Sequence, residues 1–149
     1  MDAAQDRFKV LLRDHIALCL RDLGFKGSGQ NFSLPSETHW ALLWFQRSQW
    51  SSAETVSFTV NLTVVSREVW DNRPADFNLP DKPGHWDLAP FMHDELQGEF
   101  WHRRIGELMP RGLDHWWDVT DDASAEALTE EVVAAIRDYA LPAMRRQMT

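Results

Sequence analysis

The sequence predicts an α+β fold, an antiparallel sheet of about four to six strands with the N- and C-terminal helices packed on one face. Apolar residues recur at helical spacing near both ends of the chain, whereas residues 39–64 carry two strand patterns. The loop between those strands, Ser51–Glu54, is short enough for a hairpin, so the strands are antiparallel neighbours. A length of 149 residues favours one domain, residues 1–149, with a core that needs no disulfide or metal.

The first element is a helix that ends at Gly24. Its apolar stripe is followed by this glycine, which suits the left-handed residue that closes a helix, and Phe25 folds back on the last turn. The stripe comprises Phe8, Leu11, Leu12, His15, Ile16, Cys19 and Leu23. We expect Lys26–Gly29 to be a flexible turn, because its glycines lack the Lys-Ser/Thr of a phosphate loop.

Three strands follow this turn. Gln30–Leu34 stops at Pro35 and has the length of an edge strand that could pair with another copy. His39–Trp50 begins apolar on both faces, which predicts a central strand covered on both sides. Residues 56–64 alternate apolar and polar side chains, which predicts a strand with one buried and one polar face.

A long loop is expected over residues 67–99. Four prolines interrupt it, yet its aromatic residues, including Trp70, Phe77 and Trp86, are too apolar for a disordered linker. Long segments without secondary structure are often functional. Two interpretations stay open, a wrap that buries its own aromatics on the sheet and a lid that faces a ligand.

The rest of the chain predicts a turn, a strand and a helix. Pro110–Gly112 forms the turn, and Asp114–Val119 forms a strand with one indole of Trp116-Trp117 on each face. The last helix starts near Asp122 or Ser124, with buried Leu128, Val132, Ile136 and Tyr139. Pro142 should end or kink it, leaving 143–149 as an exposed basic turn.

Charge and cysteine content restrict the classes of partner and compartment. Fifteen Lys and Arg against 23 Asp and Glu give a net charge of −8, which disfavours nucleic acid and anionic membranes and favours a basic partner. The single cysteine, Cys19, excludes an intrachain disulfide. The polar first residues precede no apolar run, so we expect no signal peptide, no membrane span and a cytoplasmic location.

Four short motifs resemble one protein family. They are Leu23-Gly-Phe-Lys, Trp44-Phe-Gln-Arg-Ser, Phe58-Thr-Val-Asn-Leu, and Arg104-Ile-Gly-Glu-Leu with Trp116-Trp downstream. Their order is similar to that in the uncharacterised bacterial family called domain of unknown function 4304. The resemblance implies a compact α+β domain and implies no activity, cofactor or catalytic residues.

No motif predicts catalysis or a cofactor. His85, His93, His102 and Asp94 lie in or beside the long loop, but their spacing is not that of a zinc site, so we expect no metal. Cys19 belongs to a buried helix stripe, where a thiol is usually inert, and no Gly-x-Ser-x-Gly elbow occurs. We interpret Arg103-Arg104 as ion-paired, since phosphate binding needs a wider basic face.

The candidate binding residues are Gln46, Arg47, Trp50, Asn61 and Trp86. The strand from His39 turns polar at Gln46 while keeping a tryptophan, and amides, a guanidinium and an indole together can hydrogen-bond and stack on a ligand. The alternative is a strand end that runs out into solvent, with Trp50 capping the core.

Two functions are consistent with these features. The first is a non-catalytic interaction domain, for example an inhibitor-like or immunity-like protein that binds a basic protein partner. The second is a small-molecule-binding domain, with or without enzymatic chemistry, whose pocket lies between the sheet and the long loop. Small size, acidity, eight tryptophans and the lack of a catalytic motif favour the first.

Overall fold

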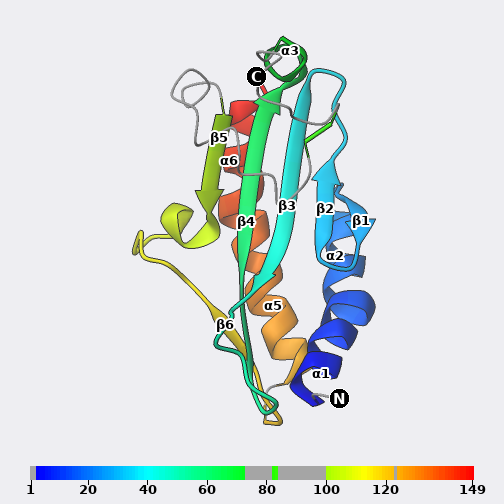
Figure 1. Ribbon diagram of the computed structural model, residues 1–149, viewed down its shortest axis with the longest axis vertical. Helices are drawn as coiled ribbons and strands as arrows, with labels where there is room; N and C mark the ends of the chain where they lie inside the picture. The colour runs from blue at the N-terminus through cyan, green and yellow to red at the C-terminus, as the bar shows by residue number, and fades with distance from the viewer. Residues whose placement is uncertain (1–2, 73–81, 84–99, 123) are drawn as a thin grey trace.

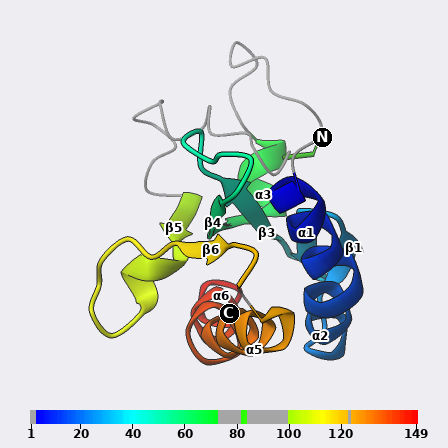
Figure 2. The same cartoon turned by 90° about the horizontal axis from the view of Figure 1, so that it is seen from below.

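A computed structural model describes residues 3–72, 82–83, 100–122 and 124–149 of the chain. Its antiparallel sheet has the order β1-β2-β3-β4-β5, and β6 also pairs with β4. On β4, the strand β5 pairs with residues 61–65 and β6 pairs with residues 56–58. Two long helices lie on one face of this sheet (Figures 1 and 2). The antiparallel sheet and the N- and C-terminal helices confirm the predicted α+β fold. The strands are β1 Lys26–Ser28, β2 Asn31–Leu34, β3 His39–Arg47, β4 Val56–Ser66, β5 Phe100–Arg104 and β6 Trp117–Val119.

The N-terminal helix is continuous from Ala3 to Asp22. It consists of α1 (Ala3–Leu11), a π-helical turn at Leu12–Ile16 and α2 (Ala17–Asp22), and the residues at both joins keep right-handed helical angles. As predicted, Gly24 closes it with a φ of 107°, and the backbone N–H of Phe25 donates to the carbonyl of Leu20 at 3.0 Å.

The C-terminal helix runs from Ala125 to Gln147 and does not end at Pro142, so the expected end of the helix at this proline was wrong. It consists of α5 (Ala125–Ala135), a π-helical turn at Ile136–Ala140 and α6 (Leu141–Gln147). Pro142 lies in the first turn of α6, directly after the π-helical turn. The N-cap is Ser124, as predicted, and its hydroxyl accepts from the N–H of Ala127 at 3.2 Å.

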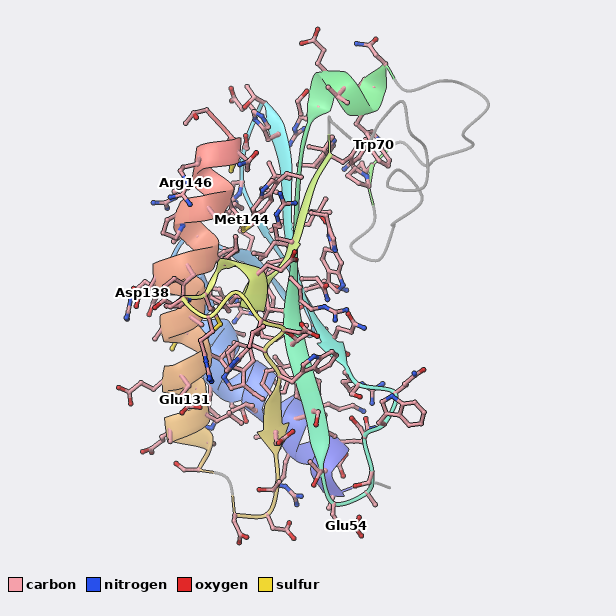
Figure 3. All side chains as sticks on the ribbon, turned by 90° about the vertical axis from the view of Figure 1, so that its left-hand side faces the viewer. Glu54, Trp70, Glu131, Asp138, Met144 and Arg146 are labelled. Atoms are coloured by element: carbon pink, nitrogen blue, oxygen red, sulfur yellow. The ribbon has the colours of Figure 1, made fainter. Side chains whose placement is uncertain are left out.

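The end of this helix is not an exposed basic turn. Ala143 and Met144 are buried, and Met144 points from α6 toward the sheet (Figure 3). Glu131, Asp138 and Arg146 lie on the outer side of the helix in the same view. The buried stripe of the helix therefore continues past the proline, through Ala143 and Met144.

Three strand boundaries differ from the predictions. The strand expected over Asp114–Val119 covers only Trp117–Val119, which is β6, so Trp116 lies outside it. Lys26–Ser28 is not a flexible turn but β1, which pairs with β2, so β2 is not an edge strand. The lack of a side chain at Gly27 lets the backbones of β1 and β2 approach closely, because a Cβ there would lie 2.2 Å from the carbonyl oxygen of Asn31. The third difference is that β3 ends at Arg47 rather than Trp50, and Trp50 lies in the following turn with 85% of its surface exposed.

The two faces of the sheet have different compositions. Alternate residues of β3 and β4 face the helices and build the main core, among them Leu43, Phe45, Phe58 and Leu62. The opposite face carries a polar row on β4, comprising Thr59, Asn61 and Thr63, which are at most 5% exposed. The prediction of a polar face was right, and these side chains are buried there because they are hydrogen-bonded to neighbouring segments.

The segment after β4 begins with a helix rather than a loop. α3 (Arg67–Asp71) starts at Ser66, whose hydroxyl accepts from the N–H of Val69 at 3.0 Å. It places Trp70 in a second apolar cluster with Val65 and Phe100, on the sheet face opposite the long helices. β5, which sequence periodicity did not predict, begins at Phe100. Most of the expected 67–99 loop, and so the choice between a wrap and a lid, lies outside the described residues.

Candidate functional site

The predicted binding residues separate into two groups. Gln46 and Asn61 lie side by side on the sheet face opposite the helices, where Asn61 Nδ2 donates to Gln46 Oε1 at 2.8 Å. Arg47 lies on the helix side, where its guanidinium donates to Gln5 Oε1. Trp50 is exposed and does not cap the core, and Trp86 lies outside the described residues. Strand alternation placed Gln46 and Arg47 correctly on opposite faces, but β3 ended too early to bring Trp50 beside Gln46.

Arg104 on β5 is the centre of the polar group that contains Gln46 and Asn61. Its Nη2 donates to Gln46 Oε1 at 3.2 Å, and its Nε lies 3.5 Å from Asn61 Oδ1. Its Nη1 donates to Asp114 Oδ2 at 3.1 Å, an ion pair whose side chains are 33% and 50% exposed. The guanidinium is therefore held from three sides in one orientation, since each contact uses a different nitrogen.

The segment from Ile105 to Trp116 carries Asp114 to this position. It begins with a 3-10 turn, Ile105–Leu108, and it is held on β4 by the hydroxyl of Thr59, which donates to the carbonyl of His115 at 2.6 Å. Gly106 allows its two ends to touch, because a Cβ on Gly106 would lie 2.1 Å from the carbonyl oxygen of Leu113. Trp116 Nε1 then donates to Asp114 Oδ2 at 2.8 Å.

An open groove of about 370 Å³ adjoins this group, lined by His102, Arg104, Glu107 and Asp114. Oε2 of Glu107 accepts from the backbone N–H of Arg104 at 2.7 Å, and the guanidinium of Arg104 lies 5.3 Å from the ring centre of Trp116. None of the described residues donates to Oδ1 of Asp114 or to Oε1 of Glu107, so both oxygens are available to a partner. The groove holds two carboxylates and one guanidinium, with an indole beside it.

His102 forms the neutral wall of the groove. Its ring stacks on Trp44 with 5.6 Å between ring centres, and its Nδ1 lies 3.1 Å from the hydroxyl of Thr63. Burial lowers the pKa of His102 from its ordinary value of 6.5; the nearby carboxylate of Glu107 opposes this effect, and the guanidinium of Arg104 adds to it. The imidazole is consequently uncharged at neutral pH, so this wall of the groove adds no charge to that of Arg104, Glu107 and Asp114.

We expect this histidine to make the protein less stable in mild acid. Because the folded-state pKa lies below the unfolded-state pKa, the unfolded chain binds more protons below about pH 6.5, and stability falls as pH falls through that window. Urea unfolding between about pH 7.5 and pH 5.5 should show a smaller acid-induced loss for His102→Gln than for the unaltered protein. A control, His15→Gln, should keep the full loss, and equal losses in all three proteins would contradict the assignment.

Sequence reasoning identified only part of this group. It interpreted Arg104 as ion-paired, which the contact with Asp114 confirms, but it gave no role to Asp114 or Glu107. Among the described residues Arg103 makes no ion pair, and it lies over Trp101 at 5.7 Å. The alternation of Phe100, His102 and Arg104 was the available signal for β5, and five residues after a long segment without periodicity are too few to establish a strand.

The described residues contain no cluster of metal-ligating side chains. Within them, no group of three His, Cys, Asp or Glu side chains is placed to hold a metal ion, while His85, His93 and Asp94 lie outside them. Cys19 is a free, half-buried thiol on the N-terminal helix. In the part of the chain that the structure describes, the helices are too short or too polar to cross a membrane.

Comparison with known proteins identifies the family. The model of the family described as Domain of unknown function (DUF4304) matches residues 16–146, which include α2, the described strands of the sheet, the groove and nearly all of the C-terminal helix, but not α1. No curated protein and no solved structure matches the chain. The match confirms the resemblance carried by the four short motifs, and it covers nearly the whole chain. The chain belongs to the DUF4304 family.

Proposed function

We propose that this chain is a non-catalytic interaction domain that binds a basic segment of another protein at the groove around Arg104. An inhibitor or immunity protein directed at a basic partner is one concrete form. We place it in the bacterial cytoplasm, since its one cysteine suits a reducing compartment and its family resemblance is to bacterial proteins. The arrangement of Asp114 and Glu107 around a fixed guanidinium supports this proposal.

The charges of the groove favour a cationic side chain. Two carboxylates outnumber the one guanidinium, and each has an oxygen free of hydrogen bonds from the described residues. A lysine or arginine of the partner would place its cationic group between Asp114 and Glu107 and donate hydrogen bonds to their carboxylates. The indole of Trp116 packs against the guanidinium of Arg104 and helps to keep it in place beside the two carboxylates.

The hydrogen bonds within the group favour binding over catalysis. Gln46, Asn61 and Asp114 hold Arg104 in place before any partner arrives, so little side-chain entropy is lost on binding. The net charge of −8 adds a long-range attraction that accelerates the encounter with a basic protein.

The test is capture of a partner by tagged protein from the lysate of its native cells, with mass spectrometry of what is retained. We expect one basic protein at a stoichiometric level, released as salt rises, and reduced at least about tenfold by Glu107→Gln combined with Asp114→Asn. The fold should survive this double change, because a partly exposed ion pair contributes only about 0–1 kcal/mol.

The matched control removes the same charge elsewhere. Glu130→Gln combined with Glu131→Gln alters two exposed residues on α5, in the helix layer behind the sheet, and should retain the partner in full. Retention of no protein, or equal loss in both double variants, would contradict binding at the groove.

A further inference from the structure

We infer a second binding site, for a small amphipathic carboxylate, in the cleft between the N-terminal helix and the β1–β2 turn. This site goes beyond the proposed function and uses the opposite side of the sheet. The cleft has a volume of about 540 Å³, within the range of small-molecule sites. Its lining comes from α1 and the adjoining π-helical turn, from the β1–β2 turn and from the end of β3, elements that lie side by side in Figures 1 and 2.

One end of the cleft is apolar. Phe8 and Leu12 line it, and both are at most 3% exposed because they belong to the main core. Phe8 is further held by the ring of Phe58, 5.0 Å away between ring centres. A floor fixed by core packing keeps its shape without a ligand, so an apolar chain can bury its surface there at little cost in protein ordering.

The other end of the cleft carries positive charge, although the protein as a whole has a net charge of −8. Lys9, Arg13 and Arg47 are the charged residues that line the cleft, and no carboxylate is among its described lining residues. Arg13 is committed to Asp14, which leaves Lys9 and Arg47 as the excess positive charge. In a chain with 23 acidic and 15 basic residues this local excess favours an anion.

Hydrogen bonds hold the cationic end in position. The guanidinium of Arg47 donates to Gln5 Oε1. Gln30 is held against Phe45 of β3 by two hydrogen bonds. Its side-chain Nε2 donates to the backbone carbonyl of Phe45 at 2.7 Å, and its backbone carbonyl accepts from the backbone N–H of Phe45 at 2.9 Å. A neighbouring hollow of about 520 Å³ continues from Arg47 past Ser48 and Gln49 with a polar lining.

These features specify the ligand class. The carboxylate lies against Arg47 and Lys9, and the unbranched apolar chain lies along Phe8 and Leu12. The planar guanidinium of Arg47 can bind both oxygens of a carboxylate, which the point charge of an ammonium group cannot do with the same geometry. The π-helical turn at Leu12–Ile16 lies at the apolar end, and such turns are frequent at functional sites.

Decanoate is the probe for this site, tested by calorimetric titration and by amide chemical shifts of the labelled protein. We expect saturable binding of one decanoate, with shifts at Phe8, Leu12 and Gly29. Acetate lacks the apolar chain, and decyltrimethylammonium has the opposite charge, so both should bind at least about tenfold more weakly. Absence of decanoate binding, or equal affinity for decyltrimethylammonium, would overturn the inference.

Three variants locate the site. Arg47→Gln and Lys9→Gln alter exposed residues and should each weaken decanoate binding about tenfold with unchanged thermal unfolding. Arg145→Gln removes an exposed charge at the far end of α6 and should leave the affinity unchanged. Equal affinities for all three variants and the unaltered protein would overturn the site.

A vesicle assay separates a free carboxylate from a lipid surface. When vesicles of phosphatidylglycerol are pelleted, the protein should stay in the supernatant. Sedimentation that Arg47→Gln abolishes would overturn the free-ligand form and assign the cleft to a membrane lipid. Glu107→Gln combined with Asp114→Asn should leave decanoate binding intact, so failure of the interaction groove and failure of this cleft are distinguishable.

Discussion

Replacing Phe58 by alanine is expected to lower the free energy of unfolding by about 3–5 kcal/mol, the largest effect of any substitution considered. Phe58 lies on the helix side of β4 with no exposed surface. Its ring contacts three others, with centre-to-centre distances of 5.0 Å to Phe8, 5.7 Å to Trp117 and 6.1 Å to Phe45. Removing it opens a cavity between the N-terminal helix, β3 and β6, which the surrounding sheet cannot close.

Urea unfolding followed by tryptophan fluorescence measures this loss. The control is Trp50→Ala, which removes a larger aromatic ring from a turn where 85% of the residue is exposed. It should change stability by less than about 0.5 kcal/mol, as surface substitutions usually do. A loss below about 1 kcal/mol for Phe58→Ala would show that these rings do not pack as one unit.

Gly106→Ala is expected to be the second most damaging change, with a loss of about 2–3 kcal/mol. The added Cβ would lie 2.1 Å from the carbonyl oxygen of Leu113 and 2.6 Å from the backbone nitrogen of His115. Both are backbone atoms, so no side-chain rotation relieves the contact. The segment that carries Asp114 must therefore move away from β5 and weaken the ion pair with Arg104.

This change separates the groove from the rest of the fold. Nuclear magnetic resonance should show shifted amides for residues 104–116, and the partner captured by the unaltered protein should be lost. Leu113→Ala is the control, because the side chain of Leu113 is 65% exposed and only its backbone contacts Gly106. Normal stability and normal partner capture for Gly106→Ala would mean that the segment is not held by this close approach.

The candidate groove was only partly predictable from sequence. Alternation within each strand assigned Gln46 of β3 and Asn61 of β4 to a polar surface, because side chains two positions apart in a strand lie on the same face. The same rule cannot give the distance between Asn61 and Arg104, which are 43 positions apart and meet through the pairing of β4 with β5. Asp114 lies in no strand, and its place depends on the contact between Gly106 and Leu113.

Sequence by itself determined the elements whose signal is local. The two long helices, the caps at Gly24 and Ser124 and the hairpin of β3 and β4 follow from periodicity and capping chemistry within a few residues. Tertiary structure decided that Lys26–Ser28 pairs as a strand, that the helix passes through Pro142, and that Arg104 meets both Gln46 and Asp114. Those outcomes depend on strand register and on contacts between distant segments, whose energies no local pattern records.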